Sequence, residues 1–294
     1  MISSGRKAAG LLADSCWFRR GRAVWERNQH DLEMPLTRLE KLAVGAYLIL
    51  HDFSAGLFPP AFGDQSQAHE AEVAYCEITS RTLKPGAVHC HMTKPFWFGK
   101  AAEFYLNHFI HLNRSFLRHG VQPPQKVLEL GCGGGWMCEF LAVMGFQVVG
   151  TTIAPYDVEI GLKRAQSLKT RELPSALEFR VAPMETVDER VRDLGPFDAV
   201  FAYEALHHCY DWRQTLRSAY ACLKPGGRLF LFNEPNLLHT CVAYRVAKIS
   251  HTHEIGFNPG EVRRVLRACG FKDCTMLRSR FHCFIAPFSL TARK

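Results

Sequence analysis

The fold of this chain is decided by the segment Val127-Leu-Glu-Leu-Gly-Cys-Gly-Gly-Gly-Trp136. The short apolar run Lys126–Leu130 predicts a β-strand, and the run from Trp136 to Met144 predicts an α-helix. The glycines between them adopt backbone angles that are closed to other residues, and they let a ligand lie directly on the main chain. The start of the helix offers free N–H groups and the positive end of the helix dipole. The segment therefore predicts a strand, a ligand-binding turn and a helix.

The spacing of these glycines and the residue before them narrow the choice of ligand. The order G-x-G-x-G, through Gly131, Gly133 and Gly135, differs from a dinucleotide fingerprint, which needs its third glycine where Trp136 stands. No G-K-[ST] follows, so the turn is not a P-loop. Glu129, two residues before the first glycine, is placed to accept a hydrogen bond from the cationic amino group of an amino-acid moiety.

Short apolar runs alternate with helical ones from this turn to the end of the chain. The predicted strands are 126–130, 147–151, 177–181, 197–202, 228–232, 273–280 and 282–288. The predicted helices between them are 136–144, 156–168, 212–223 and 258–268. This alternation is typical of βαβ units and predicts a doubly wound α/β fold with a mostly parallel sheet. Ligands of such sheets bind beyond the carboxyl ends of the strands.

A Pro-rich break at residues 120–125 divides the chain into two regions. Before the break, residues 36–53 and 96–119 have helical patterns. The second of these helices carries an apolar-aromatic face from Phe104 to Phe116, and Pro95-Phe-Trp-Phe98 precedes it. These aromatic residues either roof an acceptor or pack against the second region. We therefore expect a mainly helical N-terminal region at residues 1–120, which either covers the substrate or only packs on the second region, and a ligand-binding domain at residues 121–294.

The glycine turn resembles motif I of the class I S-adenosylmethionine-dependent methyltransferases, and three later segments continue the resemblance. Residues 197–208 are similar to the fourth-strand motif of that family and residues 223–230 to its fifth-strand motif. Residues 253–271 are similar to its late helix and Gly-Phe turn. The resemblance implies a seven-stranded sheet, S-adenosyl-L-methionine as the methyl donor, and in-line transfer to a nucleophile. The first 120 residues lie outside it.

The resemblance also implies roles for single residues around the cofactor. The methionine part would be wrapped by Gly131, Cys132, Gly133 and Gly135, with Glu129 beneath its amino group. Tyr203 would border the sulfonium and the acceptor pocket.

Two acidic residues that are usual in the family are replaced in this chain. Thr152 stands where an acid normally holds the ribose hydroxyls, and Pro183 stands where a second acid normally lies near the adenine. In the similar cyclopropane-fatty-acid synthases a polar residue a few positions later binds the ribose. Asp157 has that place here, so we expect it to bind the ribose with Thr152 nearby; the alternative is that it only charges the start of a helix. Met184 either stacks on the adenine or packs in the core.

His207 and His208 follow the fourth predicted strand, at the rim where an acceptor should lie. An imidazole is suited to remove a proton from a hydroxyl or an acidic carbon at neutral pH. Either histidine is therefore a candidate general base, and the alternative for each is a packing role. Glu234 and Asn236, after the fifth strand, either bind the acceptor or cap the helix that follows.

The sequence predicts no metal site and a reducing environment. His89-Cys-His91, His251 and His253 carry ligand side chains, but nothing nearby supplies a matched second pair. The 11 cysteines are scattered without zinc-ligand or disulfide spacing, which favours a cytoplasmic protein. The apolar run Leu42–Leu50 is far shorter than the roughly 20 residues that span a bilayer, so we expect a soluble protein.

The chain carries a formal net charge of +8 that is spread along its length. Its first 30 residues form a solvated basic arm, and the alternative is peripheral contact with a membrane or another anionic surface. The six bases are Arg6, Lys7, Arg19, Arg20, Arg22 and Arg27. No stacking platform of aromatic residues accompanies them, so we expect no nucleic-acid partner.

These features together predict methyl transfer from S-adenosylmethionine to oxygen or carbon of a small-molecule or lipid-like acceptor. The Asp/Asn-Pro-Pro-Tyr signature of amino-methylating nucleic-acid enzymes is absent after the fourth strand, where Tyr203-Glu-Ala-Leu206 stands. The alternatives are a nucleic-acid methyltransferase that uses the basic arm, a non-catalytic binding protein of the same fold and, more distantly, a nicotinamide dehydrogenase. The sequence does not specify the acceptor or the oligomeric state.

Overall fold

The computed structural model describes residues 15–27, 29, 31–32, 34–57, 64–81, 93–96, 100–173, 176–254, 256–277 and 287–294. Four helices precede the first strand: α2 (Cys16–Arg27), α3 (Arg38–Ser54), α4 (Gln65–Arg81) and α5 (Lys100–Arg118). The next elements are β1 (Lys126–Leu130), α6 (Trp136–Val143), β2 (Gln147–Thr152), α7 (Pro155–Thr170) and β3 (Ala176–Val181). They are followed by α8 (Val187–Arg190), β4 (Phe197–Tyr203), α9 (Trp212–Cys222) and β5 (Leu223–Glu234). The last elements are α10 (Leu237–Ser250), α11 (Pro259–Ala268), β6 (Lys272–Met276) and β7 (Phe288–Arg293).

The seven strands form one sheet in the order β3-β2-β1-β4-β5-β7-β6. β1, β2, β3, β4 and β5 run parallel to their neighbours, whereas β7 is antiparallel to both β5 and β6. The winding reverses between β1 and β4, where crevices for ligands form in doubly wound sheets. The predicted doubly wound, mostly parallel seven-stranded sheet is confirmed.

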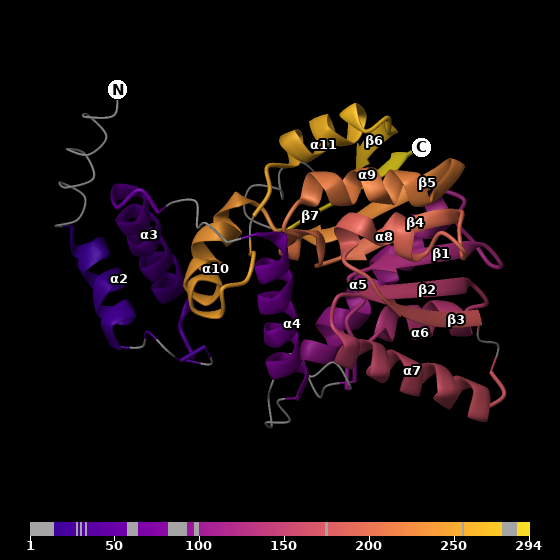
Figure 1. Ribbon diagram of the computed structural model, residues 1–294, viewed down its shortest axis with the longest axis horizontal. Helices are drawn as coiled ribbons and strands as arrows, with labels where there is room; N and C mark the ends of the chain where they lie inside the picture. Colours follow the sequence, from indigo (N-terminus) through magenta and orange to yellow (C-terminus); the bar gives the residue numbers. More distant parts are fainter. Residues whose placement is uncertain are drawn as a thin grey trace.

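Helices cover both faces of this sheet (Figure 1). On one face α5, α6 and α7 bury an aromatic-rich cluster that includes Phe116, Phe201 and Phe230. On the other face α8, α9 and α11 pack a second cluster over β1, β4 and β5. Burying a large apolar side chain contributes roughly 1.5–3 kcal/mol, so these two layers hold the strand ends in fixed positions.

The N-terminal helices α2 and α3 lie away from the sheet and pack with α10, which is inserted after β5 (Figure 1). A small apolar cluster of Val24, Val44, Leu48 and Tyr244 joins the three helices. Gly45 is required where α3 meets α10, because a Cβ atom there would lie 1.6 Å from the carbonyl oxygen of Cys241. α4 lies between this group of helices and the sheet (Figure 1).

Three helices were not predicted from the sequence, and one predicted strand was misplaced. α2 forms within the segment expected to be a basic arm, and α4 and α8 fall in segments to which no element was assigned. α10 begins directly after Asn236, where a helix was expected as one alternative but without bounds. β7 begins at Phe288, where the strand predicted at residues 282–288 was expected to end; residues 281–286 lie outside the described part of the chain.

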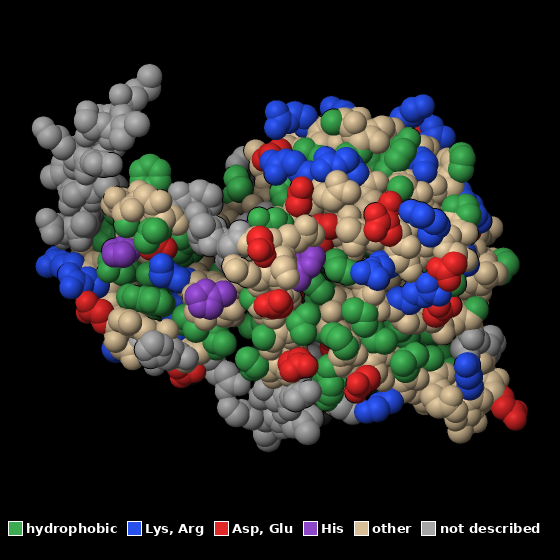
Figure 2. Space-filling model, in the orientation of Figure 1, with side chains coloured by type: hydrophobic (Ala, Val, Ile, Leu, Met, Phe, Trp, Pro, Cys, Tyr) green, Lys and Arg blue, Asp and Glu red, His purple; other side chains and the backbone are tan. Residues whose placement is uncertain are grey.

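Basic side chains are distributed in separate groups over the described surface. Figure 2 shows Lys and Arg side chains over α2 and, apart from these, over α9 and α11. Within the described ranges no helix is long and apolar enough to cross a membrane. The described cysteines are free thiols.

Candidate active site

A cavity of about 510 Å³ opens at the carboxyl ends of the central strands. Its walls come from the glycine turn after β1, the end of β2, the start of α7 and the segments after β3, β4 and β5. α4 and α10 close it from the side opposite the sheet. The predicted site residues that line it are Glu129, Gly131, Cys132, Gly133, Thr152, Asp157, Met184, Tyr203, His207 and His208.

The glycine turn has the left-handed backbone that its composition indicates. The φ angles of Gly131, Gly133 and Gly135 are 65°, 51° and 74°, in a region that side chains disfavour. A Cβ on Gly131 would lie 2.6 Å from the Cβ of Ala205, which follows β4. Gly135 is the N-cap of α6 and lies against the ring of Phe179, behind the cavity wall rather than in it.

Glu129 lies at the floor of the cavity and is 3% exposed. The thiol of Cys138 donates to its Oε2 at 2.8 Å. Burial raises the pKa of Glu129 to about 8, and the thiol and the charge of Lys94 oppose this only in part. A ligand with a cationic amino group would restore the charged form of the carboxylate. The site therefore suits the amino-acid end of S-adenosylmethionine.

Asp157 and Met184 line the part of the cavity next to the glycine turn. Asp157 is 1% exposed and stands in the first turn of α7, where Ala154 is the N-cap. The Oγ1 atom of Thr152, at the end of β2, accepts from the N–H of Ala154 at 3.4 Å. Met184 lies against Gly131, so its side chain contacts both the cavity and the second core cluster.

Tyr203 lies at the end of β4 between aromatic rings of two helices. Its ring centroid is 6.2 Å from that of Trp136 and 5.5 Å from that of His108 on α5. Tyr105 on α5 also lines the cavity, whereas Phe104 is 46% exposed and Phe116 is buried on the sheet. One part of the aromatic face of α5 therefore borders the cavity, and another part packs in the core.

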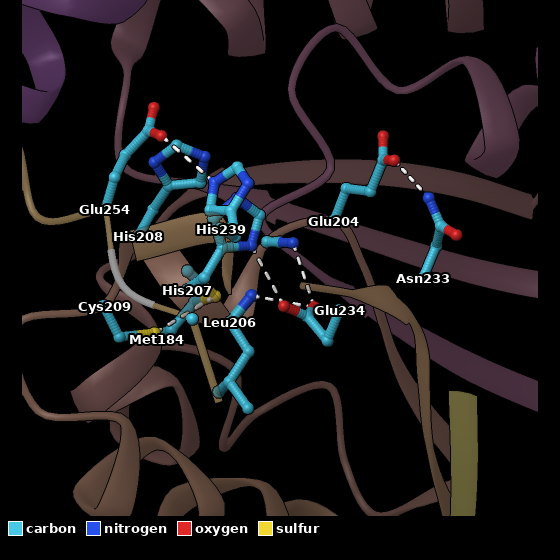
Figure 3. A network of polar contacts seen from close by, with 12 residues as sticks. Met184, Glu204, Leu206, His207, His208, Cys209, Asn233, Glu234, His239 and Glu254 are labelled. Atoms are coloured by element: carbon cyan, nitrogen blue, oxygen red, sulfur yellow. Dashed lines mark hydrogen bonds and ion pairs between the residues drawn. The ribbon is translucent and has the colours of Figure 1, made fainter. Parts of the chain in front are cut away.

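His207 is held by Glu234 at the end of β5 (Figure 3). The Oε2 atom of Glu234 lies 3.0 Å from Nδ1 of His207, and its Oε1 accepts the backbone N–H groups of Ala205 and Leu206. Burial raises the pKa of Glu234 to about 7, although these N–H groups favour its charge. Burial and the neighbouring His208 lower the pKa of His207 well below its ordinary value. The pair therefore presents a neutral imidazole to the cavity.

Glu234 and Asn236 support the site without lining the cavity. Glu234 is fully buried behind His207, so neither of its two expected roles, binding the acceptor or capping the next helix, is observed. Asn236 is the N-cap of α10, and its side chain accepts from the N–H of Leu238 at 3.0 Å. The capping role, one of the two that its position allowed, is the one observed.

As one alternative, residues 1–120 were expected to cover the substrate, but the side chains that the N-terminal region and α10 contribute to the cavity wall were not predicted individually. They include His69, Glu72, Tyr75, Cys76, Lys94, Tyr105 and His239. The ammonium of Lys94 lies 5.0 Å from the ring centroid of Tyr105, and burial lowers the pKa of Lys94. No sequence motif marks these residues, because they reach the cavity only through the packing of α4, α5 and α10.

Within the described residues no group of three His, Cys, Asp or Glu side chains is arranged to hold a metal ion. His89-Cys-His91 lies outside the described part of the chain. His251 is exposed, and His253 borders the site near Tyr210.

Residues 128–231 match the sequence profile of a methyltransferase domain. The chain is 33% identical over 175 residues to a human mitochondrial protein named ubiquinone biosynthesis O-methyltransferase, over 56% of this chain and 45% of that protein. It is 32% identical over 188 residues to the Chromobacterium violaceum protein of the same function name, over 59% of this chain and 77% of that protein. The chain thus spans less than half of the human relative and about three quarters of the bacterial one.

Solved structures share the fold. A magnesium protoporphyrin IX methyltransferase from Synechocystis, with S-adenosylhomocysteine bound, superposes with a TM-score of 0.56 at 17% identity, over 79% of this chain and all of that one. A Burkholderia thailandensis 1,6-didemethyltoxoflavin-N1-methyltransferase superposes with a TM-score of 0.51 at 18% identity, over 79% and 91% of the two chains.

Proposed function

Because this chain belongs to the class I S-adenosylmethionine-dependent methyltransferases, we propose that it methylates a hydroxyl oxygen of a small, largely apolar acceptor such as a quinol or phenol. The observation that carries the proposal is the buried Glu234–His207 pair, which offers a proton acceptor at the cavity. Relatives that are named O-methyltransferases support oxygen as the target. The rings of Tyr105, Trp136 and Tyr203 in the cavity wall support an aromatic acceptor.

S-adenosylmethionine, when bound, supplies an electrophilic methyl group on a sulfonium, so the protein has to hold the cofactor and align the acceptor. The glycine turn would hold the methionine part, with Glu129 facing its amino group. Asp157 would bind the ribose hydroxyls beside Thr152, and Met184 would lie against the adenine. Tyr203 would border the acceptor next to the reacting carbon.

His207 acts as the general base in this proposal. We assign the proton of the neutral ring to Nδ1, 3.0 Å from Oε2 of Glu234, so that the carboxylate accepts it and the lone pair of the ring is on Nε2. Nε2 takes the proton of the acceptor hydroxyl as the oxygen gains the methyl group, and it then releases the proton to solvent. Positioned general bases of this kind accelerate reactions by roughly 10²–10⁴-fold.

Calorimetric titration with S-adenosylhomocysteine and transfer of radiolabelled methyl to a panel of quinols and phenols test the proposal. We expect micromolar binding that Glu129→Ala and Asp157→Ala weaken. His207→Asn should bind S-adenosylhomocysteine normally and lose about 10²-fold or more in kcat. His251→Asn is the matched control, because this histidine is exposed and its φ of 58° suits asparagine.

Two outcomes would overturn the proposal. A folded wild-type protein that does not bind S-adenosylhomocysteine is a non-catalytic member of the fold. Full activity of His207→Asn would return this histidine to a packing role, and full binding by Asp157→Ala would leave Asp157 as a charge at the start of α7.

We also propose a cytoplasmic protein that touches a membrane through its basic N-terminus. Arg19, Arg20 and Arg22 are exposed on α2 beside the exposed Trp17, a combination suited to an anionic bilayer surface. The free thiols support a reducing compartment, while the human relative is named mitochondrial. We expect the protein to co-sediment with anionic vesicles but not with neutral ones, and the Arg19→Gln/Arg20→Gln variant to co-sediment less. Equal binding to anionic and neutral vesicles would contradict an electrostatic contact.

A further inference from the structure

Adjacent histidines at the rim of the cavity have different acidic partners. His207 backs onto Glu234 of β5, whereas His208 faces Glu72 of α4. The two rings lie close together, with centroids 4.2 Å apart and planes tilted by 40° (Figure 3). Both side chains line the cavity, so an acceptor would meet the two rings together.

Glu72 connects the N-terminal helix α4 to two segments of the rim. Its side chain is 7% exposed. Its Oε1 atom accepts the backbone N–H of His253 at 2.9 Å, and its Oε2 atom lies 3.5 Å from Nδ1 of His208. α4 is anchored a second time one turn earlier, where Nε2 of His69 lies 3.3 Å from Oε2 of Glu185. A buried carboxylate is therefore fixed in direct contact with one ring of the histidine pair.

The charges around His208 favour its protonated form. Burial acts against an imidazolium, but Glu72 on α4, Glu254 before α11 and Glu234 on β5 outweigh it and raise the pKa of His208 to about 9. The other titratable groups nearby are His207, His239 on α10 and His253; His239 is paired with Glu254 at 3.3 Å. His208 is therefore a cation at neutral pH, next to the neutral His207.

The protonation state decides what each ring offers to a ligand. A neutral imidazole bonded to a carboxylate through Nδ1 presents a lone pair at Nε2, whereas an imidazolium presents an N–H donor there. Within the described part of the chain neither Nε2 atom makes a hydrogen bond. The rim thus carries one hydrogen-bond acceptor and one charged donor side by side.

We propose that Glu72 is a specificity-determining residue, which keeps His208 as an imidazolium so that the cavity selects acceptors bearing an anionic oxygen near the reactive hydroxyl. The assignment of the reactive hydroxyl to His207 rests on the proposed function; the anion-binding role of His208 does not. Helix α4 therefore supplies part of the acceptor specificity, although it lies outside the segment that resembles the methyltransferase family.

Titration of the imidazole signals by NMR tests the charge on His208 directly. The wild-type signal, assigned with a His208→Asn variant, should titrate near pH 9. Glu72→Gln keeps the size of the side chain and an acceptor for the N–H of His253 but removes the charge, so the midpoint should fall by more than one pH unit. Glu72→Asp keeps the charge and should restore most of the shift. Glu70→Gln, on the exposed side of the same helix, is the matched control and should leave the midpoint in place.

Binding of benzoate and of benzamide, an anionic and a neutral probe of similar shape, tests the selectivity. Wild-type protein should prefer benzoate by about tenfold, as expected for one charge-assisted hydrogen bond, and Glu72→Gln should lose that preference. Unchanged titration of His208 in Glu72→Gln, or equal binding of the two probes by the wild type, would overturn the inference. Binding of S-adenosylhomocysteine is measured on the wild type and on every variant. A wild-type protein that does not bind it would contradict the proposed function, whereas the titration of His208 and the binding of the two probes would still decide the role of Glu72.

Discussion

At the scale of single residues, the surroundings of each buried carboxylate in this cavity determine its charge. Glu129 is deeply buried, whereas 12% of the Glu254 side chain is exposed. Burial raises the pKa of Glu129 to about 8, while the pKa of Glu254 is held at about 2. Burial acts against the charge of Glu254 as well, but His239, His208 and His207 outweigh it. Glu129 has a thiol as its hydrogen-bond partner and a distant ammonium. The cofactor end of the cavity, at Glu129, therefore has little positive charge. The acceptor end, at His207, His208 and His239, has more.

The raised pKa of Glu129 predicts that ligand binding releases protons. At pH 7 this carboxyl is mostly protonated, because its pKa is about 8; the cationic amino group of S-adenosylhomocysteine would lower that pKa and expel the proton. Calorimetry at pH 7 in two buffers of different ionisation enthalpy should show up to about one proton released, and affinity should rise as the pH approaches 8. Glu129→Gln should bind more weakly with no release. Release that persists in this variant would assign the proton to another group.

Residues close together in the sequence were predictable, and residues assembled by packing were not. Glu129 and the glycines of the turn lie within one short segment whose spacing carries the information. Glu72 reaches His208 across 136 positions, which only the docking of α4 determines. The sequence predicted correctly that Glu234 lies at the end of the fifth strand. Its side chain is turned away from the cavity by hydrogen bonds with two backbone N–H groups after β4, which the sequence pattern does not show.

At the scale of elements, the helices with a clear start or a clear apolar face were predictable. α3 begins with a capping box, in which Thr37 and Glu40 exchange hydrogen bonds with each other's backbone N–H groups. α10 instead follows a strand closely and buries residues on more than one side, against α3 and against the cavity. Its contact with α3 depends on the absence of a side chain at Gly45. A helix shared between two partners lacks the single apolar stripe from which helices are recognised.

At the scale of the whole molecule, the cavity has one wall on the sheet domain and another on α4 and α10. α10 carries His239, Val242 and Val246 of the lining, and its other side packs on α3. Because loosening of α3 would displace this wall, the N-terminal helices are coupled to the acceptor end of the cavity. The glycine turn and Glu129 lie on β1 and its loop, so the cofactor end does not depend on this contact.

Asp52 of α3 is the residue through which this coupling can be tested. Its side chain is 3% exposed. The carboxylate accepts from Tyr244 Oη at 2.9 Å and Lys248 Nζ at 2.6 Å, both on α10, and Nδ1 of His51 lies 3.0 Å from it. Burial acts to raise the pKa of Asp52, but these three donors outweigh it and lower the pKa below its ordinary value. The carboxylate therefore stabilises the fold above about pH 4, and this contribution is lost as the pH falls below that value.

Asp52→Ala should lower the free energy of unfolding by about 3 kcal/mol, because it leaves the Lys248 and Tyr244 donors without their acceptor. Urea denaturation at pH 7 measures this loss, and the difference from the wild type should shrink towards pH 3. KM for the acceptor should rise, whereas affinity for S-adenosylhomocysteine should stay the same. Glu26→Gln, which breaks the exposed Arg22–Glu26 pair on α2, is the control and should change stability by less than about 0.5 kcal/mol. If Asp52→Ala weakens cofactor and acceptor binding equally, the two ends of the cavity are not separable, and the N-terminal helices support the whole site rather than one wall of it.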